Sequence, residues 1–111
     1  MSTPGNEELF SNEEPKVRRV KIAPVVTTNE AKVICISGGP GDALARHKVN
    51  ENALLLVKKG RVAYSEGGDP IELSEGEGHG IPAEVFHQVT CVTDAEVFVV
   101  VPIRGKIKFE R

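Results

Sequence analysis

Two stretches decide the fold of this chain: residues 41–60, GDALARHKVNENALLLVKKG, and residues 76–91, GEGHGIPAEVFHQVTC. Each stretch begins with a glycine and carries a histidine in a run of alternating residues, His47 in the first and His87 in the second, which also holds His79 between two glycines. Short runs rich in Val, Leu and Ile, separated by Gly, Pro and Asn, are typical of β-strands joined by turns. Both histidines are therefore expected on strands.

The same pattern continues outside these stretches, and no helical periodicity is present. A set of short strands at fairly regular spacing predicts an all-β barrel or sandwich. The C-terminal run 103–110 alternates, with Ile103, Ile107 and Phe109 on one face. The strands are expected at residues 17–22, 32–37, 44–49, 53–58, 61–65, 71–73, 76–81, 86–92, 96–101 and 103–110.

Size and composition exclude several classes of protein. The chain has 111 residues, which suits one domain. A net charge of -2 gives no field for nucleic acid, and the absence of Trp removes the best base-stacking side chain. No apolar run approaches the ~20 residues that cross a bilayer. We expect neither nucleic acid nor a membrane as partner.

The N-terminal residues 1–15 are acidic and nearly devoid of apolar side chains. This composition predicts a flexible tail, followed by a β-barrel domain over residues 16–111. The tail does not have the apolar core of a secretory signal, so a cytoplasmic location is expected. The two cysteines, Cys35 and Cys91, have no CxxC spacing, and in that compartment two reduced thiols are expected.

The spacing of glycine, proline and histidine resembles the two motifs of the cupin superfamily, G(x)5HxH(x)3-4E(x)6G and G(x)5PxG(x)2H(x)3N. Gly41, His47 and Gly60 match the first motif; Gly76, Pro82 and His87 match the second. The resemblance covers residues 41–91. It implies a single-domain antiparallel β-barrel of the jelly-roll type (a double-stranded β-helix, RmlC-like) and a homodimer in which N-terminal strands pair with the neighbouring sheet.

Four positions depart from the family pattern. Val49 and Ala53 stand where the first motif has a second histidine and a glutamate, and neither side chain can donate an electron pair to a metal. Glu84 and Cys91 replace the glycine and asparagine of the second motif. The resemblance places His47 and His87 at ligand positions for a divalent metal, but a catalytic metal generally keeps about three protein ligands. The metal site is therefore expected to be lost or weakened.

Alternation along the strands predicts which side chains share a pocket. If His47 faces the interior, Val49, Ala53 and Leu55 accompany it. Substitute donors for a metal such as Zn, Fe, Mn or Ni would be Cys91 or, from the turn, Glu51. On the second strand the expected pocket residues are His87, Val89 and Cys91.

Three functions remain open at this point. The first, which we favour, is a protein that binds a small molecule in the barrel pocket through His47 and His87. The second is a metal-dependent enzyme of the dioxygenase or isomerase kind, using the two histidines with substitute ligands. The third is a metal-free enzyme in which a histidine acts as general base. Whether the protein is an enzyme is left undecided by the sequence.

Overall fold

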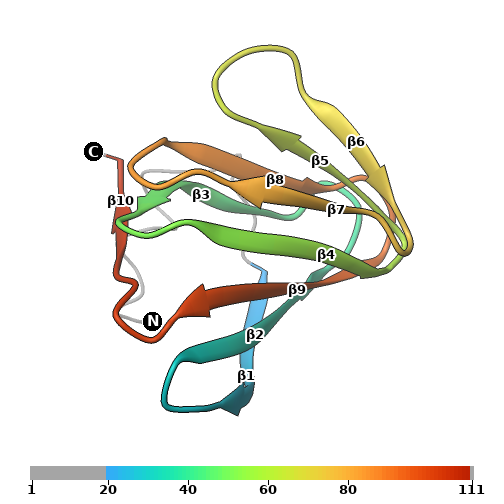
Figure 1. Ribbon diagram of the computed structural model, residues 1–111. Helices are drawn as coiled ribbons and strands as arrows, with labels where there is room; N and C mark the ends of the chain where they lie inside the picture. The colour runs from blue at the N-terminus through green and yellow to red at the C-terminus, as the bar shows by residue number, and fades with distance from the viewer. Residues whose placement is uncertain (1–19, 111) are drawn as a thin grey trace, which may run out of the picture.

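The computed structural model describes residues 20–110, which form ten β-strands (Figure 1). The predicted tail, residues 1–15, and the first part of the strand expected at 17–22 lie outside the described residues. The strands are β1 (Lys21–Thr27), β2 (Ala31–Gly38), β3 (Ala43–Val49), β4 (Ala53–Lys59), β5 (Arg61–Ser65), β6 (Ile71–Ser74), β7 (Gly78–Ile81), β8 (His87–Cys91), β9 (Ala95–Pro102) and β10 (Ile107–Phe109).

The strands form two antiparallel five-stranded sheets that face each other. The first has the order β1-β2-β9-β4-β7 and the second the order β10-β3-β8-β5-β6. Figure 1 shows the β5–β6 hairpin projecting at one side and β10 standing across one end of the molecule. The all-β, jelly-roll fold class expected from the sequence is confirmed.

The space between the sheets holds the hydrophobic core. Strands β4 and β9 alternate strictly between buried and more exposed positions, so one face of each is apolar and turned inward. Leu55, Val57, Val62 and Tyr64 are essentially inaccessible to solvent. Among the described residues the buried polar side chains are His47 and His87.

Two expectations about the ends of the chain were wrong in part. Within the described residues, the strand expected to end at residue 22 continues to Thr27, and Pro24 lies within it. Proline is tolerated because β1 is an edge strand, and the register shifts between Pro24 and Val26, as in a β-bulge. At the other end, a turn that contains Gly105 interrupts the strand expected at 103–110, so Ile103 is not part of β10.

The glycines of the two motifs lie where the backbone requires them. Gly41, Gly60 and Gly76 have φ angles of 88°, 78° and 85°, in the left-handed region that glycine enters at little cost. Glu84 stands at the motif glycine before His87 and also has a positive φ, 66°. The turn is therefore retained although its residue has changed.

Contacts with β3 hold this turn at Glu84. Its backbone N–H donates to the carbonyl oxygen of Val49 at 2.7 Å, and its carboxylate pairs with Lys48 at 3.1 Å. These contacts tie the segment before β8 to the strand that carries the other histidine.

Candidate functional site

The two buried histidines lie side by side on neighbouring strands. His47 on β3 is the direct cross-strand partner of His87 on β8, and their ring centroids are 4.2 Å apart in an edge-to-face arrangement. Their exposed fractions are 6% and 2%. The sequence placed them in one pocket, and the register of the two strands brings their rings into contact.

Both imidazoles are held in the neutral state. Burial lowers the pKa of His47, and the neighbouring His87 lowers it further, against a backbone hydrogen bond that raises it. Burial likewise lowers the pKa of His87, with Arg46 acting in the same direction, while the backbone of Val85 and the carboxylate of Glu66 oppose the shift.

Backbone contacts set the tautomer of each ring. Nδ1 of His47 lies 2.8 Å from the carbonyl oxygen of Ala45, and Nδ1 of His87 lies 3.2 Å from that of Val85. A carbonyl oxygen only accepts hydrogen bonds, so in each neutral ring Nδ1 carries the hydrogen. Nε2 is therefore the nitrogen with a free electron pair, and both side chains can accept a hydrogen bond or coordinate a cation.

A cavity of about 360 Å³ lies between the sheets next to the histidines. Its wall is almost entirely hydrocarbon, and Val49, Ala53, Leu55 and Val89 are part of it, at the positions that strand alternation indicated. The sequence reasoning missed Lys32 and Phe109 in the wall. The alternation of β2, with Lys32, Ile34 and Ile36 on one face, was the signal for the first of these.

Aromatic rings pack around the two histidines. The Phe109 ring lies 5.6 Å from that of His47, and the Tyr64 ring lies 5.8 Å from that of His87. The Tyr64 hydroxyl donates to Glu66 at 2.7 Å, and burial raises its pKa. The third histidine, His79, is only half-buried and packs its ring on Tyr64 at 4.5 Å.

The substitute donors suggested by the sequence are not in the wall of this cavity. Cys91 is buried, but its Sγ lies beside Gly38, towards the opposite end of the strands. Burial raises the pKa of its thiol, and nearby Asp42 and Asp94 raise it further, so the thiol stays protonated. Glu51 occupies the turn between β3 and β4 and is half-buried there.

The described residues do not fit a three-ligand metal centre. His47 and His87 supply two imidazole nitrogens, and the positions of the two missing ligands carry Val49 and Ala53. Within residues 20–110, no three His, Cys, Asp or Glu side chains come together as a metal-binding group.

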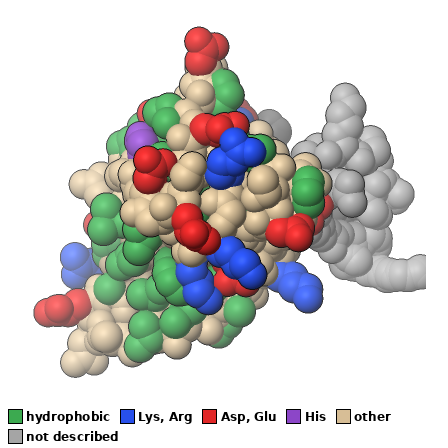
Figure 2. Space-filling view, turned by 90° about the vertical axis from the view of Figure 1, so that its right-hand side faces the viewer, with side chains coloured by type: hydrophobic (Ala, Val, Ile, Leu, Met, Phe, Trp, Pro, Cys, Tyr) green, Lys and Arg blue, Asp and Glu red, His purple; other side chains and the backbone are tan. Residues whose placement is uncertain are grey.

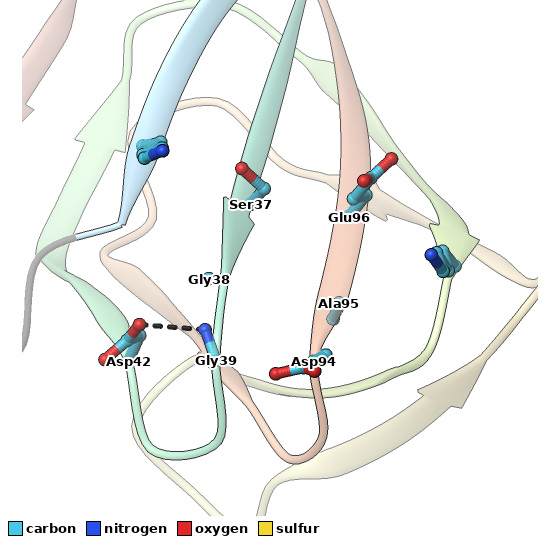
Figure 3. A pocket seen from close by; sticks show the side chains of 9 residues that line it. Ser37, Gly38, Gly39, Asp42, Asp94, Ala95 and Glu96 are labelled. Atoms are coloured by element: carbon cyan, nitrogen blue, oxygen red, sulfur yellow. Dashed lines mark hydrogen bonds between the residues drawn. The ribbon is translucent and has the colours of Figure 1, made fainter.

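A second cavity, of about 370 Å³, lies at the opposite end of the strands (Figure 3). Its lining is polar and contains acidic and basic side chains, including Asp42, Asp94, Glu96, Lys21 and Lys59. The carboxylate of Asp42 accepts a hydrogen bond from the N–H of Gly39 at 2.8 Å and closes the β2–β3 turn. We call this the polar end, and the end with the histidine cavity the apolar end.

Comparison with solved structures shows the same fold in other proteins. A conserved protein with a double-stranded β-helix domain from Klebsiella pneumoniae has a TM-score of 0.74 and 20% identity, covering 88% of this chain and 93% of that one. An RmlC-like cupin from Desulfovibrio desulfuricans has a TM-score of 0.70 and 23% identity, covering 76% and 82%. At these identities the likeness concerns the fold alone.

A further solved structure, a cupin superfamily protein from Desulfitobacterium hafniense, gives a TM-score of 0.70 at 14% identity, covering 78% of this chain and 80% of that one. No protein with a curated function matches the sequence. In residues 20–110 no helix is long and apolar enough to cross a membrane. The family model described as the cupin domain matches residues 32–102, which contain all of the histidine pair and most of the cavity wall, so the chain belongs to the cupin family.

Proposed function

We propose that this cupin binds a small, largely apolar molecule in the cavity between its sheets, with His47 and His87 as hydrogen-bond acceptors and no metal. One observation carries the proposal: two buried, neutral imidazoles contact each other in the wall of a cavity of about 360 Å³ that is otherwise apolar. Apolar walls with a few convergent polar groups are typical of small-molecule sites. The expected cytoplasmic location is part of this proposal and rests on the sequence.

An uncharged probe molecule tests whether the cavity binds a small ligand, independently of any ionic contact. We expect 3-phenylpropan-1-ol to shift the methyl NMR signals of Leu55 and Val89, because its hydrocarbon part fills the cavity and its hydroxyl can donate to a free Nε2. Replacing His87 by Phe keeps a ring in place and removes that acceptor, which weakens binding by about fivefold, the effect of one hydrogen bond.

His79→Phe is the matched control, because His79 is not part of the cavity wall. This variant should bind the alcohol as the unaltered protein does. A protein whose Leu55 and Val89 signals do not respond to millimolar alcohol, while its fold is intact by circular dichroism, would contradict the binding proposal.

The alternative function, that of a metal-dependent enzyme, can be tested directly by metal analysis. Such an enzyme would need a donor besides His47 and His87, and the described residues supply none in the cavity wall. Metal analysis of protein purified without a metal-affinity tag, after incubation with Fe, Mn, Ni or Zn, should show less than one equivalent of bound metal. Stoichiometric metal that disappears in both His47→Ala and His87→Ala would overturn the metal-free proposal.

General-base catalysis by a histidine without metal is the remaining alternative. The neutral state of His47 and His87 suits a base, but their Nδ1 atoms are oriented by backbone carbonyls rather than by a carboxylate. Tyr64, which packs against His87, directs its hydroxyl to Glu66. We therefore favour binding over catalysis.

We also propose that the protein forms a homodimer through the outer face of the β1-β2-β9-β4-β7 sheet. Cross-strand register places apolar residues in two rows across the outside of this sheet, and Leu54 and Leu56 there are 57% and 45% exposed. In Figure 2 hydrophobic side chains gather on one side of the molecule. We call the residues of the two cross-strand rows the outer patch: Ala23, Val26, Val33, Cys35, Leu54, Leu56, Phe98 and Val100.

The outer patch suits contact with a second copy of itself. Monomeric proteins rarely leave large contiguous apolar patches in water, and a two-fold interface joins one patch to its copy. Beside Phe98, Lys58 and Glu96 form an ion pair at 3.1 Å and provide both signs of charge at the border. Sedimentation equilibrium should give a dimer that Leu54→Lys/Leu56→Lys dissociates.

Ile71→Lys is the control for that experiment, because Ile71 is an equally exposed apolar residue on the other sheet. It should leave the dimer intact. A protein that sediments as a monomer at micromolar concentration would contradict the homodimer.

A further inference from the structure

A single lysine side chain is part of the wall of the histidine cavity. Lys32 lies on β2 at the same parity as Ile34 and Ile36, and all three residues line the cavity. Lys32 pairs across the sheet with Val101, which also lines it. The lysine is half-buried and belongs to the first sheet, opposite the sheet that carries the histidines.

No acidic group neutralises this lysine within residues 20–110. Arg46, Lys48, Lys58 and Arg61 each have a carboxylate partner there, whereas Lys32 has neither an ion pair nor a side-chain hydrogen bond. Among the residues that the structure describes, no Asp or Glu lines the cavity. A cation at the margin of an apolar space attracts an anion more strongly than one in bulk water, because the effective dielectric constant is lower.

The surroundings of the cavity at this end add positive charge. A neighbouring depression of about 360 Å³ is lined by Lys48, Lys106 and Lys108 with one acid, Glu84. Ile107 belongs to the lining of both spaces. Since Glu84 pairs with Lys48, the other two lysines leave the lining of this depression with a net positive charge, which would raise the encounter rate of an anion.

We propose that the ligand of this cavity is an organic monoanion, a carboxylate on a compact hydrocarbon body. Its charged group contacts the Lys32 ammonium, and its body fills the apolar space and places a hydrogen-bond donor, such as a hydroxyl, at Nε2 of His47 or His87. A single lysine balances a single negative charge, whereas a dianion would leave one charge without a partner in an apolar setting. This inference rests on the proposed binding function and names the class of ligand.

A matched pair of probes separates this inference from the binding proposal. Titration with 3-phenylpropanoate and 3-phenylpropan-1-ol compares one carbon skeleton with and without the charge. We expect the carboxylate to bind about tenfold more tightly at low ionic strength, the effect of a charge-assisted hydrogen bond. Equal affinities would overturn the anion inference and leave the binding proposal standing, and absence of binding by either probe would contradict both.

Variants of Lys32 test whether this residue causes the preference for the carboxylate over the alcohol. Lys32→Gln should abolish the preference for the carboxylate over the alcohol, and Lys32→Arg should restore it. Lys59→Gln removes the same charge at the polar end and is the control. A preference that survives Lys32→Gln, or that Lys59→Gln removes equally, would overturn the role of Lys32.

A third probe molecule tests whether the cavity prefers a ligand with one negative charge to a ligand with two. We expect 3-phenylpropyl phosphate, which carries close to two charges at neutral pH, to bind no more tightly than the carboxylate. Phosphate binding ten times tighter than carboxylate binding would show that the site takes a dianion and would overturn the proposed ligand class.

Discussion

The two ends of the barrel hold cavities of nearly equal size, about 360 and 370 Å³, with opposite linings. The polar end is lined by acids and bases that can pair with one another or with the turns around them, as Asp42 does with Gly39. The apolar end holds two neutral histidines and, among hydrocarbon, a lysine with no acidic partner within residues 20–110. Lining chemistry, rather than volume, indicates which cavity binds a ligand.

The difference follows from what each end does in the fold. The β2–β3 and β8–β9 turns meet at the polar end. There a charged side chain, that of Asp42, accepts a hydrogen bond from the backbone of its own turn. At the apolar end, inward side chains of β2, β3, β4, β8 and β9 line one cavity. Substitutions at the two ends should therefore affect different properties.

The largest effect is expected at the polar end, from Gly60→Ala. A Cβ on Gly60 would collide with the carbonyl oxygen of Asp94, and the φ of 78° is unfavourable for alanine. Steric overlap and left-handed strain together should lower the free energy of unfolding by about 4 kcal/mol. Urea denaturation measures this free energy of unfolding. A decrease of less than about 1 kcal/mol would show that the turn can accommodate a Cβ at position 60.

Leu55→Ala should produce the next largest effect, at the apolar end. Leu55 is 1% exposed and lies in the cavity wall, so its truncation removes buried hydrocarbon and enlarges the cavity. The free energy of unfolding should fall by about 3 kcal/mol. Leu54→Ala, on the exposed outer patch, is the control and should cost much less in a monomeric state.

Because of the two buried histidines, the stability of the protein should decrease at acidic pH. Their pKa values are lowered on folding, so the unfolded chain binds protons more readily than the folded one. Stability from this source is complete above the unfolded pKa of about 6.5 and decreases as the pH falls through the lower folded values. Chemical denaturation at pH 7.5 and 5.5 should show the decrease.

The double variant His47→Gln/His87→Gln is the control for that measurement, because it removes both titrating rings. It should lose less stability than the unaltered protein over the same pH interval. An equal loss in both proteins would assign the acid sensitivity to other groups.

The smallest effect is expected from Glu84→Gly, next to the apolar end. Glycine relieves the positive φ of 66° but loses the exposed ion pair with Lys48, which contributes little. The free energy of unfolding should rise by about 0.5 kcal/mol. Glu84→Ala keeps the strain and loses the pair, so it should be less stable than the glycine variant.

Much of the fold could be predicted because the decisive residues act locally. Gly41, Gly60 and Gly76 specify left-handed turns, and alternation assigns Val49, Leu55 and Val89 to one face. The ends of the chain could not be predicted as well. Pro24 within an edge strand and the turn at Gly105 depend on which neighbours each segment pairs with.

The site was only partly predictable for the same reason. Spacing identified His47 and His87 as partners, but it also grouped Cys91 with them, since alternation gives the face of a strand and not the position along the barrel axis. The structure places Cys91 towards the polar end. Lys32 lies far from the histidines in sequence and was missed, because its place in the wall depends on the packing of the two sheets.

The sequence by itself determined the strand pattern, the motif turns and the identity of the two inward histidines, because short-range backbone preferences and period-two alternation govern these features. The tertiary structure alone decided that the histidines touch, that burial favours their neutral state, and that a lysine without an acidic partner among residues 20–110 shares their cavity. Those properties depend on burial and on distances between strands remote in sequence, and a residue pattern contains neither.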